Sequence, residues 1–124
     1  MITPYLIYKD DPSAEVWIDQ AISKEHSSLL TEDLKAVVNN PAGSGYAAHR
    51  TDMELAGKTG TAELKIRNKG TTGQEIGWFS VFTTDPSASK PVLLTSMVES
   101  VEDKGGSTYV VKKDAAVLDS YFGS

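Results

Sequence analysis

The stretch of the chain most suited to chemistry is residues 54–65, which are ELAGKTGTAELK. A lysine followed by Thr-Gly-Thr suits two different chemistries. One is the glycine-rich loop that wraps the phosphates of a nucleotide. The other is a strand that binds the terminal carboxylate of a peptide during acyl transfer to a serine.

The phosphate-binding loop requires the pattern Gly-x-x-x-x-Gly-Lys-Ser/Thr and opens a helix. Its last three positions are matched by Gly57, Lys58 and Thr59. The position of its first glycine is occupied by Asp52. The residues after the lysine include β-branched threonines and lead towards a second strand instead of a helix. Sequence and context therefore both argue against a nucleotide-binding loop.

In a strand, the same residues alternate between two faces, with Thr59 and Thr61 on one face and Lys58 and Gly60 on the other. Two hydroxyls at this spacing can bind one carboxylate, and the lysine places a positive charge beside them. Gly60 leaves room for another backbone to approach. The free N–H groups of an edge strand can bind an extended peptide or a developing oxyanion. A polar edge strand with a surface lysine remains the plain alternative.

The composition limits the classes of function. The chain has 124 residues, with 40% apolar and 23% charged residues, which suits one globular domain or part of a larger one. A net charge of -5 argues against non-specific binding to nucleic acid. The chain contains no cysteine, and its two histidines, His26 and His49, lack a ligand spacing. We expect no metal site and no cofactor.

The elements around residues 54–64 indicate how this strand is held. Two further apolar strands are predicted over residues 76–84 and 91–100, after a polar connection at 65–75. Both are apolar at nearly every position, which is typical of strands buried on both faces. We therefore expect helices on both sides of an antiparallel sheet.

Helices are predicted near both ends of the chain. Residues 23–40 form the first, with Ser23 as N-cap, and residues 107–122 form the last, with Ser107 as N-cap. Segments 3–10 and 15–22 suggest an N-terminal hairpin, and residues 42–50 suggest a mobile, glycine-rich loop. The predicted fold is α+β: three consecutive antiparallel strands and a hairpin, packed by two helices. Two helices are too few to cover both faces of such a sheet.

The order of these segments resembles a known family. The stretches GKTGTAELK, GQEIGWFSVF and VEDKGG, followed by a closing helix, resemble the C-terminal part of the transpeptidase domain of class B penicillin-binding proteins. Two short stretches, Val16-Trp17 and residues 22–25, resemble the sequence that precedes the motif strand in the low-affinity, methicillin-resistance type of Gram-positive bacteria. The resemblance covers residues 3–121, so residues 1–124 are interpreted as a C-terminal fragment of such a domain. It implies an incomplete portion of a β-lactamase/transpeptidase-like fold.

The resemblance implies a role for each residue of the motif. Family members cross-link peptidoglycan: a serine attacks the D-Ala-D-Ala end of a stem peptide, and β-lactams mimic that end. By this comparison, Lys58 would hydrogen-bond the serine of a Ser-x-Asn motif and keep the site positive. Thr59 and Thr61 would hold the substrate carboxylate, and the N–H of Thr61 would serve the oxyanion hole. Gly60 would let the substrate lie against the strand.

The sequence also departs from the family pattern. It contains no Ser-x-Asn motif, and its one Ser-x-x-Lys sequence runs from Ser87 to Lys90, after Lys58 instead of before it. Pro91 prevents a helix from continuing past Lys90, so we interpret this sequence as a surface turn. The chain thus carries the third family motif without the nucleophile. We expect it to be inactive alone and not to be acylated by penicillin.

The same resemblance implies partners and a location. The implied partners of the complete domain are the D-Ala-D-Ala stem peptide and β-lactams, and the implied partner of this chain is the missing N-terminal part of the same domain. Without that part, residues 91–100 would form an unpaired apolar edge, so we expect a homo-oligomer or association with the missing part. The parent protein would work at the extracellular face of the cytoplasmic membrane.

Two alternatives remain open from the sequence. One is a non-catalytic module whose exposed sheet edge binds a peptide or a partner chain. The other keeps the fold but changes the activity to that of a β-lactamase, a D,D-carboxypeptidase or a β-lactam sensor, since these share the Lys-Thr-Gly strand. Ser-x-x-Lys and Ser-x-Asn motifs upstream in the parent gene would favour the transpeptidase.

Overall fold

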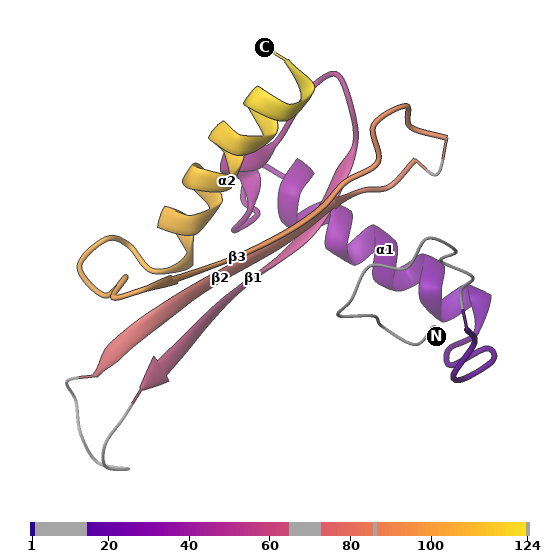
Figure 1. The fold of residues 1–124 in the computed structure, drawn as a ribbon, viewed down its shortest axis with the longest axis horizontal. Coiled ribbons are helices and arrows are strands. Elements are labelled where there is room, and N and C mark those ends of the chain that lie inside the picture. The colour runs from indigo at the N-terminus through magenta and orange to yellow at the C-terminus, as the bar shows by residue number, and fades with distance from the viewer. Residues whose placement is uncertain (2–14, 65–72, 86, 124) are drawn as a thin grey trace. The chain divides into compact units, whose positions relative to one another are not determined.

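A computed structural model of the chain describes residues 1, 15–64, 73–85 and 87–123 (Figure 1). Two compact units are present, Met1–Leu30 and Thr31–Ser124, and each is described by itself. Helix α1, Lys24–Asn39, runs across the boundary between them.

The first unit contains no strand over residues 15–22, so that part of the predicted hairpin is wrong. Val16 forms a single bridge, and the residues after it are bends and turns. Gln20 has φ 49°, a left-handed conformation that interrupts an extended backbone. The other predicted strand of the hairpin, over residues 3–10, lies outside the described residues.

Helix α1 confirms the helix predicted over residues 23–40. It begins directly after Ser23, whose Oγ accepts a hydrogen bond from the backbone N–H of His26 at 3.1 Å, as expected of an N-cap. Only the C-terminal end of its apolar stripe is buried: Val38 is fully enclosed, whereas Leu30 is 51% exposed.

The loop after α1 has more structure than the glycine-rich sequence indicates. Tyr46–Ala48 form one turn of 3-10 helix, η1, and Ala48 packs into the core. The N–H of Ala48 bonds to the carbonyl oxygen of Gly45 at 2.9 Å. This loop therefore leads to β1 along a defined path.

The three predicted strands are confirmed. They are β1 (Leu55–Leu64), β2 (Gln74–Thr83) and β3 (Leu93–Glu99), all antiparallel in the order β1-β2-β3 (Figure 1). The central strand is β2, so β1 and β3 are the two edges of the sheet that the structure describes. The predicted connection at 65–75 lies mostly outside the described residues.

Helix α2, Ser107–Phe122, packs on one face of the sheet and confirms the predicted C-terminal helix. The N-cap is Gly106, with no side-chain cap, instead of the expected Ser107. The helix lies close to β2: a Cβ on Gly77 would sit 2.8 Å from Cγ2 of Val110. The buried core consists of Val38, Ala48, Leu55, Phe79, Val81, Val110, Val111 and Leu118.

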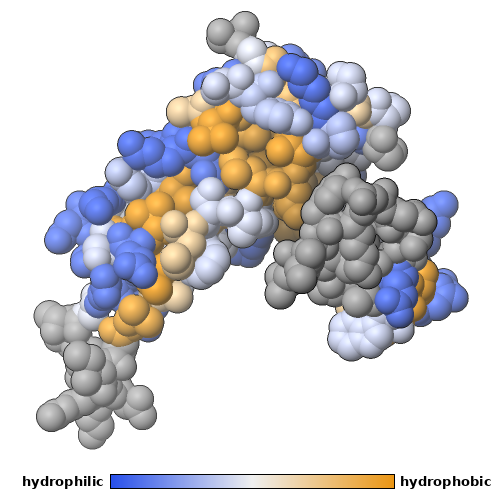
Figure 2. Space-filling model, viewed as in Figure 1, coloured by the Kyte–Doolittle hydropathy of each residue, from blue (hydrophilic) through white to orange (hydrophobic). Residues whose placement is uncertain are grey.

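On the face away from α2, the side chains of β2 are half-buried or exposed and those of β3 are exposed, so these two strands are not buried on both faces. Along β3, exposed and half-buried residues alternate strictly. Trp78 is 41% exposed, Met97 45% and Leu93 69%. An apolar band follows the sheet in the space-filling view (Figure 2). The under-covered sheet expected from the sequence is therefore present.

Candidate functional site

The tetrapeptide Lys58–Thr61 lies within β1, at an edge of the sheet. Its residues face Ser80 to Gly77 of β2, with Lys58 opposite Ser80 and Thr61 opposite Gly77. No helix begins at this position, so the structure also argues against a phosphate-binding loop. The strand assignment made from the sequence is confirmed.

The hydrogen bonds of the sheet show which backbone groups of β1 point away from β2. The N–H of Thr84 bonds to the carbonyl oxygen of Glu54 at 3.3 Å, which marks this pair as hydrogen-bonded. Because bonded pairs alternate along an antiparallel ladder, Lys58 and Gly60 turn their backbone groups towards β2. Thr59 and Thr61 therefore turn theirs outwards, away from β2.

Two contacts support this alternation. The carbonyl oxygen of Leu55 accepts a hydrogen bond from Nδ2 of Asn39 at 2.8 Å, so it points away from β2. The carbonyl oxygen of Thr59 accepts one from the Lys58 ammonium at 2.6 Å. Both residues share the parity of Thr61, whose N–H thus lies on the open side of the strand.

The side chains of Thr59 and Thr61 lie on the face of the sheet that α2 covers. The Thr59 hydroxyl is 2.8 Å from the Ser44 hydroxyl, and the Thr61 hydroxyl lies beside Gly106 at the start of α2. Lys58 and Gly60 lie on the other face, as the predicted alternation requires. The structure therefore brings two hydroxyls and an outward N–H together at one stretch of edge.

Lys58 is exposed, and its ammonium folds back onto the edge of its own strand. No contact within the described chain requires a glycine at position 60. A Cβ there would lie 3.4 Å from Cβ of Trp78, close to ordinary contact.

The sequence also places Tyr46, His49 and Arg50 just before the motif strand, where they could line its cleft, but the structure gives them other contacts. Tyr46 stacks on His49 with ring centroids 5.3 Å apart, and His49 bonds to Asn39. Arg50 forms ion pairs with Asp52 and with Asp119 of α2. It joins the segment before β1 to the end of α2.

Ser44 was not identified from the sequence. Its contact with Thr59 joins residues that are 15 positions apart. A lone serine in a glycine-rich loop has no motif of its own, so only the folded loop identifies it.

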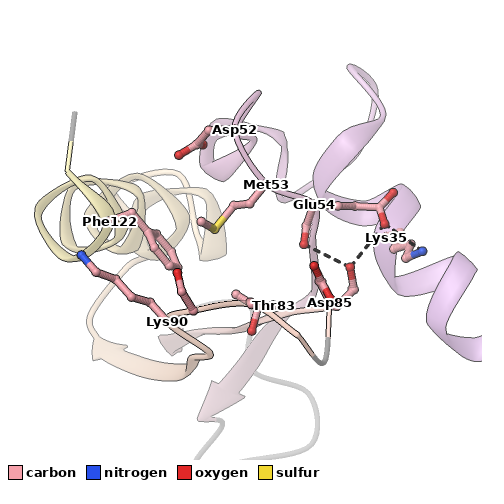
Figure 3. A pocket seen from close by; sticks show the side chains of 11 residues that line it. Lys35, Asp52, Met53, Glu54, Thr83, Asp85, Lys90 and Phe122 are labelled. Carbon is pink, nitrogen blue, oxygen red and sulfur yellow. Dashed lines mark hydrogen bonds and ion pairs between the residues drawn. The ribbon is translucent and has the colours of Figure 1, made fainter.

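A cavity of about 550 Å³ lies at the other end of β1 (Figure 3). Met53 and Phe122 contribute apolar side chains to it, and an ion pair of 2.8 Å between Lys35 and Glu54 forms part of its wall. The hydrogen bond from Lys35 lowers the pKa of Glu54. None of the residues Lys58–Thr61 lines this cavity.

The Ser87–Lys90 sequence lies beside the same cavity and is a turn, as predicted. The N–H of Ala88 bonds to the carbonyl oxygen of Asp85 at 3.1 Å, and Ser87 and Lys90 are exposed. Asp85 accepts hydrogen bonds from both the N–H and the hydroxyl of Ser87, and these lower its pKa. This serine does not begin a helix, so Lys90 does not lie one helical turn from it.

Within the described part of the chain, no cluster of His, Cys, Asp or Glu side chains could hold a metal ion. Over the same residues, no helix is both long and apolar enough to cross a bilayer.

The chain is similar to known proteins over most of its length. A family model described as the penicillin binding protein transpeptidase domain matches residues 1–118. Penicillin-binding protein 3 of Bacillus subtilis (strain 168) is 41% identical over 113 residues, which are 91% of this chain and 16% of that protein. The chain thus spans about a sixth of this relative's length.

A solved structure has the same fold. It is the apo structure of the TP domain from Burkholderia pseudomallei penicillin-binding protein 3, with a TM-score of 0.64 at 19% identity. The match covers 92% of this chain and 34% of that one. Together with the family model and the relative, it leads to one assignment: the chain belongs to the family of penicillin-binding protein transpeptidase domains.

Proposed function

We propose that this chain is the substrate-binding and oxyanion part of a peptidoglycan D,D-transpeptidase. The complete enzyme would cross-link stem peptides through an acyl-serine, and β-lactams would occupy the same site. The observation that carries the proposal is the outward-facing edge of β1 at Thr59 and Thr61, in a chain of this family.

Each residue of the motif has a proposed role. Lys58 supplies positive charge at the edge and, in the complete domain, bonds to the serine of a Ser-x-Asn motif. The hydroxyls of Thr59 and Thr61 bind the terminal carboxylate of the stem peptide. The outward N–H of Thr61 donates to the developing oxyanion, and an interaction of this kind is worth about 3–4 kcal/mol of barrier in other enzymes. Gly60 leaves space for the extended ligand.

The chain is proposed to be a C-terminal fragment of the domain and inactive by itself. It contains no Ser-x-Asn sequence, and its one Ser-x-x-Lys sequence forms an exposed turn. The nucleophile and its base would come from the preceding part of the same domain.

That preceding part is also the proposed partner of the β3 edge. The N–H of Thr83 bonds to the carbonyl oxygen of Val92 at 3.1 Å, so alternate residues after Val92 pair with β2. The backbone groups of Leu93, Thr95 and Met97 therefore point away from β2, at an edge that no other described strand pairs with, and two of these residues are exposed and apolar. Without the preceding part, a second copy of the chain would pair with this edge.

We place the complete protein among the class B enzymes, near the low-affinity, methicillin-resistance type. The support is the sequence pattern at Val16-Trp17 and 22–25. Its site of action would be the extracellular face of the cytoplasmic membrane, where stem peptides are cross-linked.

Acylation of the full-length protein that contains this segment tests the proposal. Incubation with benzylpenicillin should add one penicilloyl group, seen by intact-mass measurement. Thr59→Val should slow acylation about 10- to 100-fold, because a hydrogen bond to a charged group is lost. Lys112→Ala, an exposed lysine on α2, is the matched control and should leave the rate unchanged.

The isolated chain provides the second arm of the experiment. It should gain no mass with benzylpenicillin, and an adduct on it would disprove its inactivity. A full-length Thr59→Val protein that is acylated at the wild-type rate would overturn the role given to this strand.

A further inference from the structure

The loop between α1 and η1 places one hydroxyl directly on the proposed carboxylate-binding strand. Oγ of Ser44 lies 2.8 Å from Oγ1 of Thr59, a normal hydrogen-bond distance between hydroxyls. Thr59 is half-buried, and its face of the strand is the one that α2 covers. Ser44 is therefore in direct contact with a side chain to which substrate binding has been assigned.

The position of Ser44 is fixed by its two glycine neighbours. The N–H of Gly45 bonds to the carbonyl oxygen of Val37 at 2.9 Å, and that of Gly43 bonds to Asn40 at 2.7 Å. Both bonds use carbonyl groups at the end of α1, which helices leave unpaired.

A larger residue at Gly43 would force the backbone to shift, and one at Gly45 would fit only tightly. A Cβ on Gly43 would lie 2.3 Å from the carbonyl oxygen of Val37, and one on Gly45 would lie 3.2 Å from the buried ring of Phe79. The loop is thus pressed against α1 and the core on both sides of Ser44, which holds the backbone of this residue beside β1.

The direction of the hydrogen bond follows from the chemistry of the ligand. A hydroxyl carries one proton to donate and two lone pairs to accept. If Thr59 donated to Ser44, it would have no proton left for a carboxylate. Binding of a carboxylate therefore requires that Ser44 donates to Thr59 and that Thr59 donates to the ligand. Such a chain also strengthens each of its bonds by mutual polarisation.

We propose that Ser44 is a positioning residue that orients the Thr59 hydroxyl so that its proton faces the ligand carboxylate. This inference rests on the proposed function of Thr59. It predicts that Ser44 matters only for ligands that carry the carboxylate.

The test compares benzylpenicillin with its methyl ester in the full-length protein that contains this segment. Ser44→Ala should lower the second-order acylation rate of the acid about 3- to 10-fold, the usual effect of one neutral hydrogen bond. The variant should weaken the non-covalent binding of the acid more than it lowers the limiting rate of acylation. The same variant should leave the rate with the ester unchanged, and Ser44→Thr should restore most of the rate with the acid.

Two different failures can be told apart. If the wild-type protein reacts equally fast with acid and ester, the carboxylate is not recognised and the proposed role of Thr59 fails. If the wild type prefers the acid but Ser44→Ala keeps that preference, the role of Ser44 is refuted. An equal loss with both ligands, accompanied by a lower melting temperature, also refutes it, because the residue would then only support the loop.

Discussion

Among single residues, Asp114 is the titratable side chain with the most unusual surroundings. It lies on the face of α2 that meets the sheet and is 3% exposed. One carboxylate oxygen accepts a hydrogen bond from Ser96 of β3 at 2.7 Å, and the other has no partner among the residues that the structure describes. Burial raises the pKa of Asp114, and the bond from Ser96 opposes this only in part.

This raised pKa makes a prediction for stability against pH. The folded chain holds the Asp114 proton more firmly than the unfolded chain, whose carboxyl titrates near 3.8. The stabilising contribution is therefore complete below that value and is lost as the pH rises through the folded pKa. Each unit by which the folded pKa is raised corresponds to about 1.4 kcal/mol.

Asp114→Asn removes this titration. Its free energy of unfolding relative to the wild type should therefore increase as the pH rises from about 4 to about 8. Urea titrations followed by circular dichroism at both values measure the difference. The comparison with wild type is needed because Glu54 and Asp52, whose pKa values are lowered by ion pairs, change stability in the opposite direction. Asp103→Asn, at an exposed turn, controls for the loss of one carboxylate.

For single residues, the sequence predicts the faces of the motif residues on the strand but does not identify Ser44 or the burial of Asp114. The alternation of Lys58, Thr59, Gly60 and Thr61 follows from the strand period of two, so their faces could be assigned without coordinates. Ser44 could not be found in this way, because its contact depends on how a loop folds against a distant strand. The same holds for Asp114, whose helical position is apparent but whose burial is not.

Among the elements, the segment between α1 and β1 has the tightest steric constraint. It turns back on the end of α1 at Gly43, passes through η1 and enters β1. Its hydrogen bonds to Val37 and Asn40 hold this path. The sequence predicted the helix from its apolar period and the strand from its β-branched threonines and Lys-Thr-Gly pattern. It did not predict η1, since three residues are too few to show a period.

Gly43→Ala tests this constraint. The added methyl group would overlap the carbonyl oxygens of Val37 and Ala36, at 2.3 and 2.7 Å, so the loop must shift. We expect a loss of about 1–3 kcal/mol in the free energy of unfolding, as for other overpacked sites. Thermal melting of the chain measures it. Ala47→Ser, an exposed substitution in η1, should cause little change, and equal stability of the two variants would contradict the packing described.

For the whole molecule, the central question is what completes the sheet. Its two edges differ in chemistry. The outward positions of β1 carry threonines, whereas those of β3 include Leu93 and Met97, 69% and 45% exposed. Long apolar edges promote strand pairing with another chain. The sequence indicated this imbalance through its almost uniformly apolar strands, which the described helices cover on one face only.

Thr95→Pro tests whether β3 pairs with a second copy of the chain. The N–H of Thr95 points outwards, so proline removes a free donor without breaking the ladder to β2. We expect the wild-type chain to associate as its concentration rises, and the variant to remain monomeric, by sedimentation velocity. Thr95→Ala is the matched control, since both variants lose the hydroxyl contact with Ser80 but only one loses the N–H. Association of the proline variant at the wild-type level would exclude this edge.

The parity of the β1 ladder restricts how this segment can change during evolution or engineering. Thr59 and Thr61 combine a hydroxyl on the covered face with a backbone facing the open side because each lies an even number of positions from Leu55 along the strand. Deleting one residue between Leu55 and Lys58 would exchange their orientation with that of Lys58 and Gly60, while leaving every letter of the motif intact. Insertions and deletions should therefore be tolerated beyond the strand ends, and within the strand they should disable the site even when the motif can still be recognised.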